Sequence, residues 1–443
     1  MDSLPNEVKL TILWLLDDER DRDALVAAYP SWKDAVEYDD SFRTVKVDPA
    51  GVHRMPLKDF LERFKDSSIR QRQLLRDVKV GFHLDKNTYV CSLDLHRSFV
   101  DRWILTKAVQ EVFDTLRQLE DRVRSENNIT LVPIRLSFTT CTESIPPCDI
   151  TNCSFLRMEM EVKNALPLTH NPLTLFLEKQ HAPEVPYAAR EPSFPWLRGV
   201  HDFVFRNQGL LRYLGPLDVM VIARQMRSLR RLRLEFDEDE LWSTKSKDGW
   251  RSSICYAVAS NLYETFPIEE VHIHIGHHSL RDDIDLAALR PKYHGRPPFP
   301  ALRTFRLHFG PDTTDAKWFF VEEPSERPLP PPLRRRTLPN NRTINPLLRG
   351  AAKAVKAMEK IETFSMCLAD KFYFEVVKRV FEVHFVKAGG KKPEDDTGSG
   401  GRPTLTFKLG EKVDTWWPAD NVLAAWRSAA GGNEAGLEIL FVE

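Results

Sequence analysis

One pattern of apolar and polar positions recurs eight times along the chain. In each copy two residues separate the first apolar position from the second, and apolar residues then alternate with others, as in Leu229-x-x-Leu232-x-Leu234-x-Phe236. Alternation over a short segment is typical of a β-strand with one buried and one exposed face. Strands are therefore predicted to start at residues 42, 75, 131, 200, 229, 268, 302 and 361.

Apolar residues with helical spacing lie between several of these strands. The predicted helices are residues 101–122, 217–226, 253–266 and 347–358. Repeated strand–helix units stack into a curved solenoid, because each unit buries its apolar face against the next. The chain is therefore predicted to be an α/β protein with an irregular, leucine-rich-repeat-like α/β solenoid. An ordinary α/β domain whose strands alternate is the alternative.

Two segments are predicted to be disordered insertions. The first lies near 322–346 and is rich in proline, which cannot continue a helix or a central strand. The second lies near 388–403 and is rich in glycine and charge. Ordered structure is predicted to return with a strand at 405–409, a short helix between Trp416 and Trp426, and a last strand at 437–441 that caps the solenoid.

The first sixteen residues are predicted to form a helix that is apolar on several faces. Pro5 suits the first helical position, which needs no backbone N–H. Val8, Ile12 and Leu16 lie four residues apart on one face, and Leu13 lies on another. A helix apolar on several sides must be buried on several sides, and the segment that follows is too short to do this alone. A protein partner is therefore predicted.

The same residues carry a resemblance to a known family. Leu4-Pro5-x-Glu7-Val8-x-x-x-Ile12-Leu13-x-x-Leu16 resembles the opening of an F-box, and residues 23–36, with Leu25 and Trp32-Lys33, resemble its second half. Fungal F-box-like proteins with long C-terminal regions are similar. The resemblance implies an F-box-like helical domain over 1–41 and a repeat domain over 42–443.

The resemblance also implies a function. The chain would be the substrate-recognition adaptor of an SCF-type (Skp1–cullin–F-box) ubiquitin ligase, binding Skp1 and the cullin complex at its N-terminus and an unknown target protein through its C-terminal domain. The implied Skp1 contacts are Leu4, Pro5, Val8, Ile12, Leu16, Leu25 and Trp32. A repeat scaffold or protein-interaction module without a ubiquitin link, whose F-box has degenerated, is the alternative.

Charge and composition exclude several other classes. The 443 residues include 63 basic and 64 acidic ones, for a net charge of −1, so no overall attraction to nucleic acid or anionic membrane is expected. No apolar stretch is long enough to span a membrane, and no signal peptide is recognisable. Six cysteines in a chain of this length indicate reduced thiols, so the cytoplasm or nucleus is predicted.

Signatures of catalysis are missing from the sequence. It has no phosphate-binding glycine loop, no Gly-x-Ser-x-Gly and no His-Glu-x-x-His, so the chain is predicted not to be an enzyme and to need no cofactor. Two groups are candidate zinc ligands: His272, His274, His277 and His278, and Cys141, Cys148 and Cys153. Their spacing favours an exposed strand face and structural thiols, so no metal is predicted. A hydrolase or metal enzyme is the remaining alternative.

Basic side chains recur on the polar positions of three predicted strands. Arg231 and Arg233 alternate with Leu232 and Leu234, so they point away from the core. The possible target-binding face comprises Arg231, Arg233, His272, His274, Arg306 and His308. A solvated strand face with no ligand is the alternative.

Overall fold

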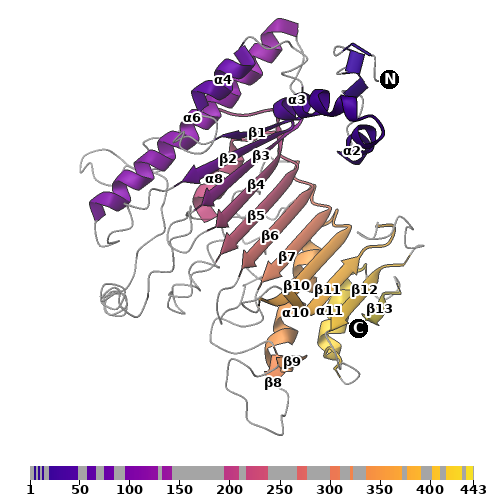
Figure 1. The fold of residues 1–443 in the computed structure, drawn as a ribbon. Helices are drawn as coiled ribbons and strands as arrows, with labels where there is room; N and C mark the ends of the chain where they lie inside the picture. Colours follow the sequence, from indigo (N-terminus) through magenta and orange to yellow (C-terminus); the bar gives the residue numbers. More distant parts are fainter. Residues whose placement is uncertain are drawn as a thin grey trace, which may run out of the picture. The chain divides into compact units, whose positions relative to one another are not determined.

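A computed structural model of the chain has an α/β architecture, which confirms the predicted class (Figure 1). The structure describes residues 4–5, 8–9, 12–13, 19–47, 57–65, 74–83, 95–127, 132–141, 194–208, 216–237, 267–276, 300–309, 320–322, 336–371, 377–390, 402–409, 416–431 and 436–442. They fall into two compact units. The first comprises Met1–Glu143, Leu175–Arg206 and Gln225–Ser228, and the second comprises Ser144–Thr174, Asn207–Arg224 and Leu229–Glu443.

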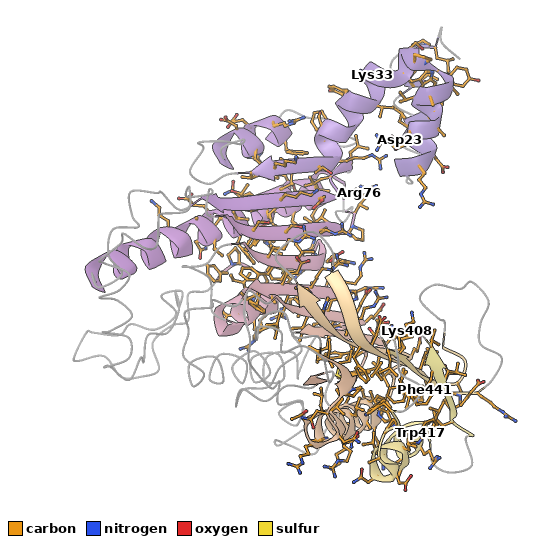
Figure 2. The ribbon with its side chains drawn as sticks, turned by 60° about the horizontal axis from the view of Figure 1, so that its bottom comes forward. Asp23, Lys33, Arg76, Lys408, Trp417 and Phe441 are labelled. Atoms are coloured by element: carbon orange, nitrogen blue, oxygen red, sulfur yellow. The ribbon has the colours of Figure 1, made fainter. Side chains whose placement is uncertain are left out.

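The first unit begins with helices and continues as a sheet. Its elements are α2 (Glu19–Ala28), η1 (Pro30–Trp32), α3 (Lys33–Arg43), β1 (Thr44–Val47), α4 (Leu57–Lys65), β2 (Asp77–His83), α6 (Leu95–Asn127), β3 (Ile134–Cys141) and β4 (Val200–Gln208). Asp23 on α2 and Lys33 on α3 mark the N-terminal helices in Figure 2. The strands lie in sequence order, β1-β2-β3-β4, and β2 is parallel to both β1 and β3.

The core of the first unit lies between the sheet and two helices. Val45 and Val47 of β1 and the corresponding residues of β2 are buried, as their alternation predicted. α4 and α6 lie side by side (Figure 1). Phe64 of α4 contacts Phe42 with ring centroids 5.8 Å apart. The apolar stripe of α6, predicted at 101–122, is buried from Val109 to Val123, because this helix covers apolar residues that would otherwise face water.

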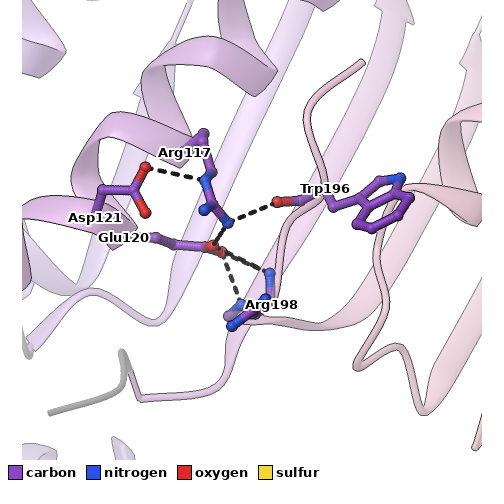
Figure 3. Close-up of polar contacts among 6 residues, drawn as sticks. Arg117, Glu120, Asp121, Trp196 and Arg198 are labelled. Carbon is purple, nitrogen blue, oxygen red and sulfur yellow. Dashed lines mark hydrogen bonds and ion pairs between the residues drawn. The ribbon is translucent and has the colours of Figure 1, made fainter. Parts of the chain in front are cut away.

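A buried carboxylate connects α6 to the start of β4 (Figure 3). Oε1 of Glu120 accepts hydrogen bonds from the backbone N–H of Arg198 at 3.0 Å and of Gly199 at 2.7 Å. Arg117 donates to the carbonyl oxygen of Trp196 at 3.2 Å. Burial raises the pKa of Glu120, and the two backbone N–H groups and Arg117 partly offset that rise. The carboxylate therefore satisfies two backbone donors where the strand begins.

Replacing Glu120 with alanine is expected to lower the free energy of unfolding by about 1–3 kcal/mol, because two backbone N–H groups lose their acceptor. Urea denaturation followed by circular dichroism measures this change. Asp121→Ala is the matched control: its side chain is more than half exposed, so a change within about 0.5 kcal/mol is expected. Equal effects of the two substitutions would contradict the role given to Glu120.

The second unit contains the remaining strands. Its elements are α8 (Pro216–Arg224), β5 (Arg231–Asp237), β6 (Glu270–Gly276), β7 (Thr304–Phe309), β8 (Phe320–Glu322), β9 (Arg336–Pro339), α10 (Asn341–Ala357), β10 (Thr363–Lys371), β11 (Val377–Val386), β12 (Thr404–Leu409), α11 (Asp420–Ala429) and β13 (Glu438–Val442). The sheet order is β5-β6-β7-β10-β11-β12-β13, and β8 pairs with β9 separately. β5, β6, β7 and β10 are parallel, β11 is antiparallel to β10 and β12, and β13 is parallel to β12.

Four copies of the repeated sequence pattern adopt the same local structure. β5, β6, β7 and β10 each begin two residues after the first apolar residue of their copy, which is buried in every case: Leu229, Ile268, Leu302 and Ile361. The residue between this buried residue and the strand makes the first backbone hydrogen bonds to the neighbouring strand. The carbonyl oxygen of Arg230 accepts the N–H groups of Glu269 and Glu270, and that of Glu269 accepts those of Arg303 and Thr304. The strands predicted to start at 229, 268, 302 and 361 are thus confirmed, with each start displaced by two residues.

Helices α10 and α11 cover the apolar face of the sheet around β10–β12. Trp426 of α11 is fully buried, with its ring centroid 5.9 Å from Phe364 of β10 and 5.5 Å from Phe385 of β11. Trp416 donates from Nε1 to Oδ1 of Asn341 at 2.9 Å, which joins the segment before α11 to the start of α10. The predicted strand at 405–409, the helix ending at Trp426 and the last strand at 437–441 correspond to β12, α11 and β13.

The predicted disordered insertion near 322–346 is wrong from residue 336 onward. β9 and the first turns of α10 occupy that segment, and Pro346 lies inside the helix. The side chain of Asn340 caps α10 by accepting the N–H of Arg342 at 3.1 Å. Residues 323–335, most of the insertion predicted near 388–403, and the helix predicted at 253–266 lie outside the described residues. Of the described helices, none is long and apolar enough to cross a membrane.

Candidate functional site

The N-terminal helices form a small apolar cluster of their own. Leu13, Trp32, Ala35 and Val36 are its buried residues. Arg43 donates to the carbonyl oxygen of Leu13 at 3.1 Å, and Lys9 donates to that of Ser31 at 3.1 Å. These two bonds tie the first segment to η1 and α3. The first turn starts at Pro5, whose carbonyl oxygen accepts the N–H groups of Val8 and Lys9.

The residues implied as Skp1 contacts take different places around this cluster. Leu4, Ile12 and Leu25 are partly buried and pack against it. Pro5 is exposed, and the side chain of Val8 is 41% exposed. Trp32 is fully buried, so it holds the helices together and presents no surface of its own. Leu16 lies outside the described residues.

The six residues of the predicted target-binding face come together on β5, β6 and β7 of the second unit. Arg233, His272 and Arg306 occupy directly paired positions on the three strands. His274 and His308 are paired one pleat further along, and Arg231 is paired with Glu270. Neighbouring strands lie about 5 Å apart, so these side chains form one surface. We call the six residues and Glu270 the β5–β7 polar face.

Basic neighbours on this face lower the pKa of Glu270. Nε2 of His272 lies 2.6 Å from Oε1 of Glu270, and the contact is an ion pair when the imidazole is protonated. The contact with His272 lowers the pKa of Glu270 against the opposing effect of partial burial, and the charges of Arg231 and Arg306 lower it further. A lowered carboxyl pKa adds stability above the unfolded-state pKa, and that contribution is lost as the pH falls through the folded-state pKa.

Two histidines on the face lie within hydrogen-bond distance of each other. Nδ1 of His274 lies 3.0 Å from Nδ1 of His308, and their rings meet at 90°. One nitrogen donates and the other accepts, so this contact holds only while at least one ring is neutral. The pair is therefore a hydrogen-bonded part of the surface. Together with the arginines it offers donors to an anionic or polar ligand.

Three residues further along the sheet belong to the same surface and were missed in the sequence. Ser365 of β10 is paired with His384 of β11, and Cys367 is paired with Glu382. Nε2 of His384 lies 2.6 Å from Oε1 of Glu382, and Nζ of Lys408 on β12 lies 4.0 Å from Oε2. The missed residues are Glu382, His384 and Lys408. Glu-Val-His at 382–384 repeats Glu-Val-His at 270–272, and this identity could have revealed them.

The positions of the described residues do not support a zinc site at either group of candidate ligands. Among the described residues no three histidine, cysteine, aspartate or glutamate side chains are placed to hold a metal ion. Cys141 ends β3, while Cys148, Cys153, His277 and His278 lie outside the described residues.

Comparison with known proteins returned no relatives: no protein-family model, no curated protein and no solved structure matches this chain.

Proposed function

We propose that this chain is the substrate-recognition adaptor of an SCF-type ubiquitin ligase, acting in the cytoplasm or nucleus. Its N-terminal helices bind Skp1, and its C-terminal region, a leucine-rich-repeat-like solenoid, binds a target protein. The observation that carries the proposal is a group of incompletely buried apolar side chains at the N-terminus: Val8 is exposed, and Leu4, Ile12 and Leu25 are only partly covered by the cluster around Leu13 and Trp32. Several apolar side chains left partly in water on one set of helices favour a protein partner.

Skp1 binding would bury apolar surface that the helices leave open. Leu4, Ile12 and Leu25 are each only partly covered by the N-terminal cluster. Completing the burial of such side chains contributes about 25 cal/mol per Å² of apolar surface. Trp32 contributes indirectly, because it fixes the positions of the helices that carry these residues. The six described residues of the motif thus divide into a contact set and a supporting core.

The target-binding half of the proposal rests on the β5–β7 polar face. Arg233 and Arg306 are exposed on this face, so their guanidinium groups can reach a partner. Parallel strands that follow sequence order, β5 to β7, support the solenoid arrangement. The chemistry would belong to the cullin complex and its ubiquitin-conjugating enzyme, and this chain would hold the target near them.

Val8→Asp is expected to abolish co-purification with Skp1 from the same source, because a charge at an exposed contact position must lose water on binding. Folding should be unaffected, since the side chain is 41% exposed. Tyr38→Asp is the matched control: its side chain is 46% exposed but lies on α3 outside the motif. It should keep Skp1. Circular dichroism of both variants verifies that they are folded.

Two outcomes contradict the proposal. A folded wild-type chain that does not co-purify with Skp1 would leave a protein-interaction scaffold as the better account. Equal retention of Skp1 by wild type and Val8→Asp would place any Skp1 contact elsewhere on the chain.

A further inference from the structure

The last strand of the second unit stands at the edge of its sheet. Within the part of the chain that the structure describes, β13 ends the strand order and pairs with β12 alone. The N–H of Glu438 donates to the carbonyl oxygen of Pro403, so Glu438, Leu440 and Val442 direct their backbone groups toward β12. By alternation, Ile439 and Phe441 direct theirs outward. These outward groups can be paired by another strand.

β13 lacks the features that protect most edges. Edge strands are usually short, or carry lysine, proline or a bulge that discourages pairing. At the start of the first unit's sheet, β1 has four residues and an exposed Lys46. β13 has the sequence Glu-Ile-Leu-Phe-Val, with apolar residues on both faces and no lysine, arginine, proline or glycine. No described strand pairs with its outer edge, so that edge can accept another strand.

Exposed apolar side chains surround the edge. Trp417 is 54% exposed and stacks on Phe441, with ring centroids 4.6 Å apart (Figure 2). Phe441 in turn stacks on Phe407 of β12 at 5.3 Å. Val442 is exposed on the opposite face. A strand placed beside β13 would cover apolar surface on both faces of the sheet.

We infer that β13 pairs with β13 of a second copy of this chain, antiparallel and about a two-fold axis through Leu440. In that register Ile439 lies opposite the partner's Phe441, and Glu438 lies opposite the partner's Val442. The outward N–H and C=O groups of Ile439 and Phe441 in both copies then form four hydrogen bonds. No like charges face each other, and each apolar face meets its own equivalent, as a two-fold interface requires.

This dimer is independent of the proposed Skp1 binding. Sedimentation velocity of the purified full chain over a concentration series should show a reversible monomer–dimer equilibrium. Leu440→Lys and Leu440→Glu each place two like charges opposite each other at the axis, and each is expected to weaken the dimer at least about tenfold. An equimolar mixture of the two variants should dimerise again, because opposite charges then meet. Such rescue cannot come from misfolding.

Thr406→Lys is the matched control, because Thr406 is paired with Leu440 on the same face but lies one strand in from the edge. It should dimerise like the wild type. A wild-type chain that stays monomeric up to about 100 μM would overturn the inference. So would a dimer insensitive to both Leu440 substitutions, a mixture that stays monomeric, or assembly into open-ended oligomers.

Discussion

Replacing Trp32 with alanine should unfold the N-terminal helices and abolish Skp1 binding. Trp32 is fully buried and is the largest buried side chain among the described residues of the N-terminal cluster. Truncating a buried tryptophan to alanine lowers the free energy of unfolding by about 3–5 kcal/mol, which is a large loss for a small group of helices. Amide hydrogen exchange across α2 and α3 measures the loss, with faster exchange expected throughout both helices.

The Trp32→Phe variant distinguishes the effect of lost side-chain volume from the effect of losing the indole N–H. Nε1 of Trp32 is buried and has no hydrogen-bond partner among the described residues, so phenylalanine gives up no bond there. We therefore expect this variant to keep the helices folded at a smaller cost. Wild-type exchange rates in Trp32→Ala would contradict the central position given to this side chain.

Replacing Trp426 with alanine should have the largest effect on the second unit. The indole is fully buried and contacts Phe364 and Phe385 on neighbouring strands, so its removal leaves a cavity between α11 and the sheet. A loss of about 3–5 kcal/mol in the free energy of unfolding is expected, measured by urea denaturation. Skp1 binding should persist if the first unit stays folded.

Trp417→Ala is the control for Trp426→Ala. Both residues are tryptophans, but Trp417 precedes α11 and is 54% exposed, so its loss should cost about 1 kcal/mol or less. Similar losses for the two tryptophans would show that α11 does not cover the sheet as described.

The strands were the part of the fold most readable from the sequence. Alternation of Leu232, Leu234 and Phe236 with charged residues reflects a single physical cause, one face in the core and one in water. In the copies that start at 229, 268, 302 and 361, the first apolar residue, such as Leu229, was assigned to the strand but lies just before it. It is buried like a strand residue, so an apolar pattern alone cannot separate the two positions.

The start of helix α10 lies in a segment whose composition predicted disorder. Prolines and arginines before residue 346 predicted disorder, and a proline inside a helix costs about 3 kcal/mol. The Asn340 cap and the buried stripe that includes Ile344, Leu348 and Ala351 offset that cost. The stripe stabilises α10 only because it packs against other elements of the fold. A single sequence does not show these contacts.

The candidate site was predicted in part. Arg233, His272 and Arg306 were expected on one face, and the register pairs them directly. His384 was missed because β11 reverses direction, so the repeat pattern that located the earlier strands does not continue through it. At the N-terminus the motif did not distinguish exposed Val8 from buried Trp32, because both are apolar and only packing separates contact from support.

The most direct test of the adaptor proposal is amide hydrogen exchange of the full chain with and without purified Skp1. The proposal predicts slower exchange at residues 4–13 and along α2 when Skp1 is added, with the strands of the second unit unchanged. Absence of protection at these residues, or protection confined to the second unit, would contradict it.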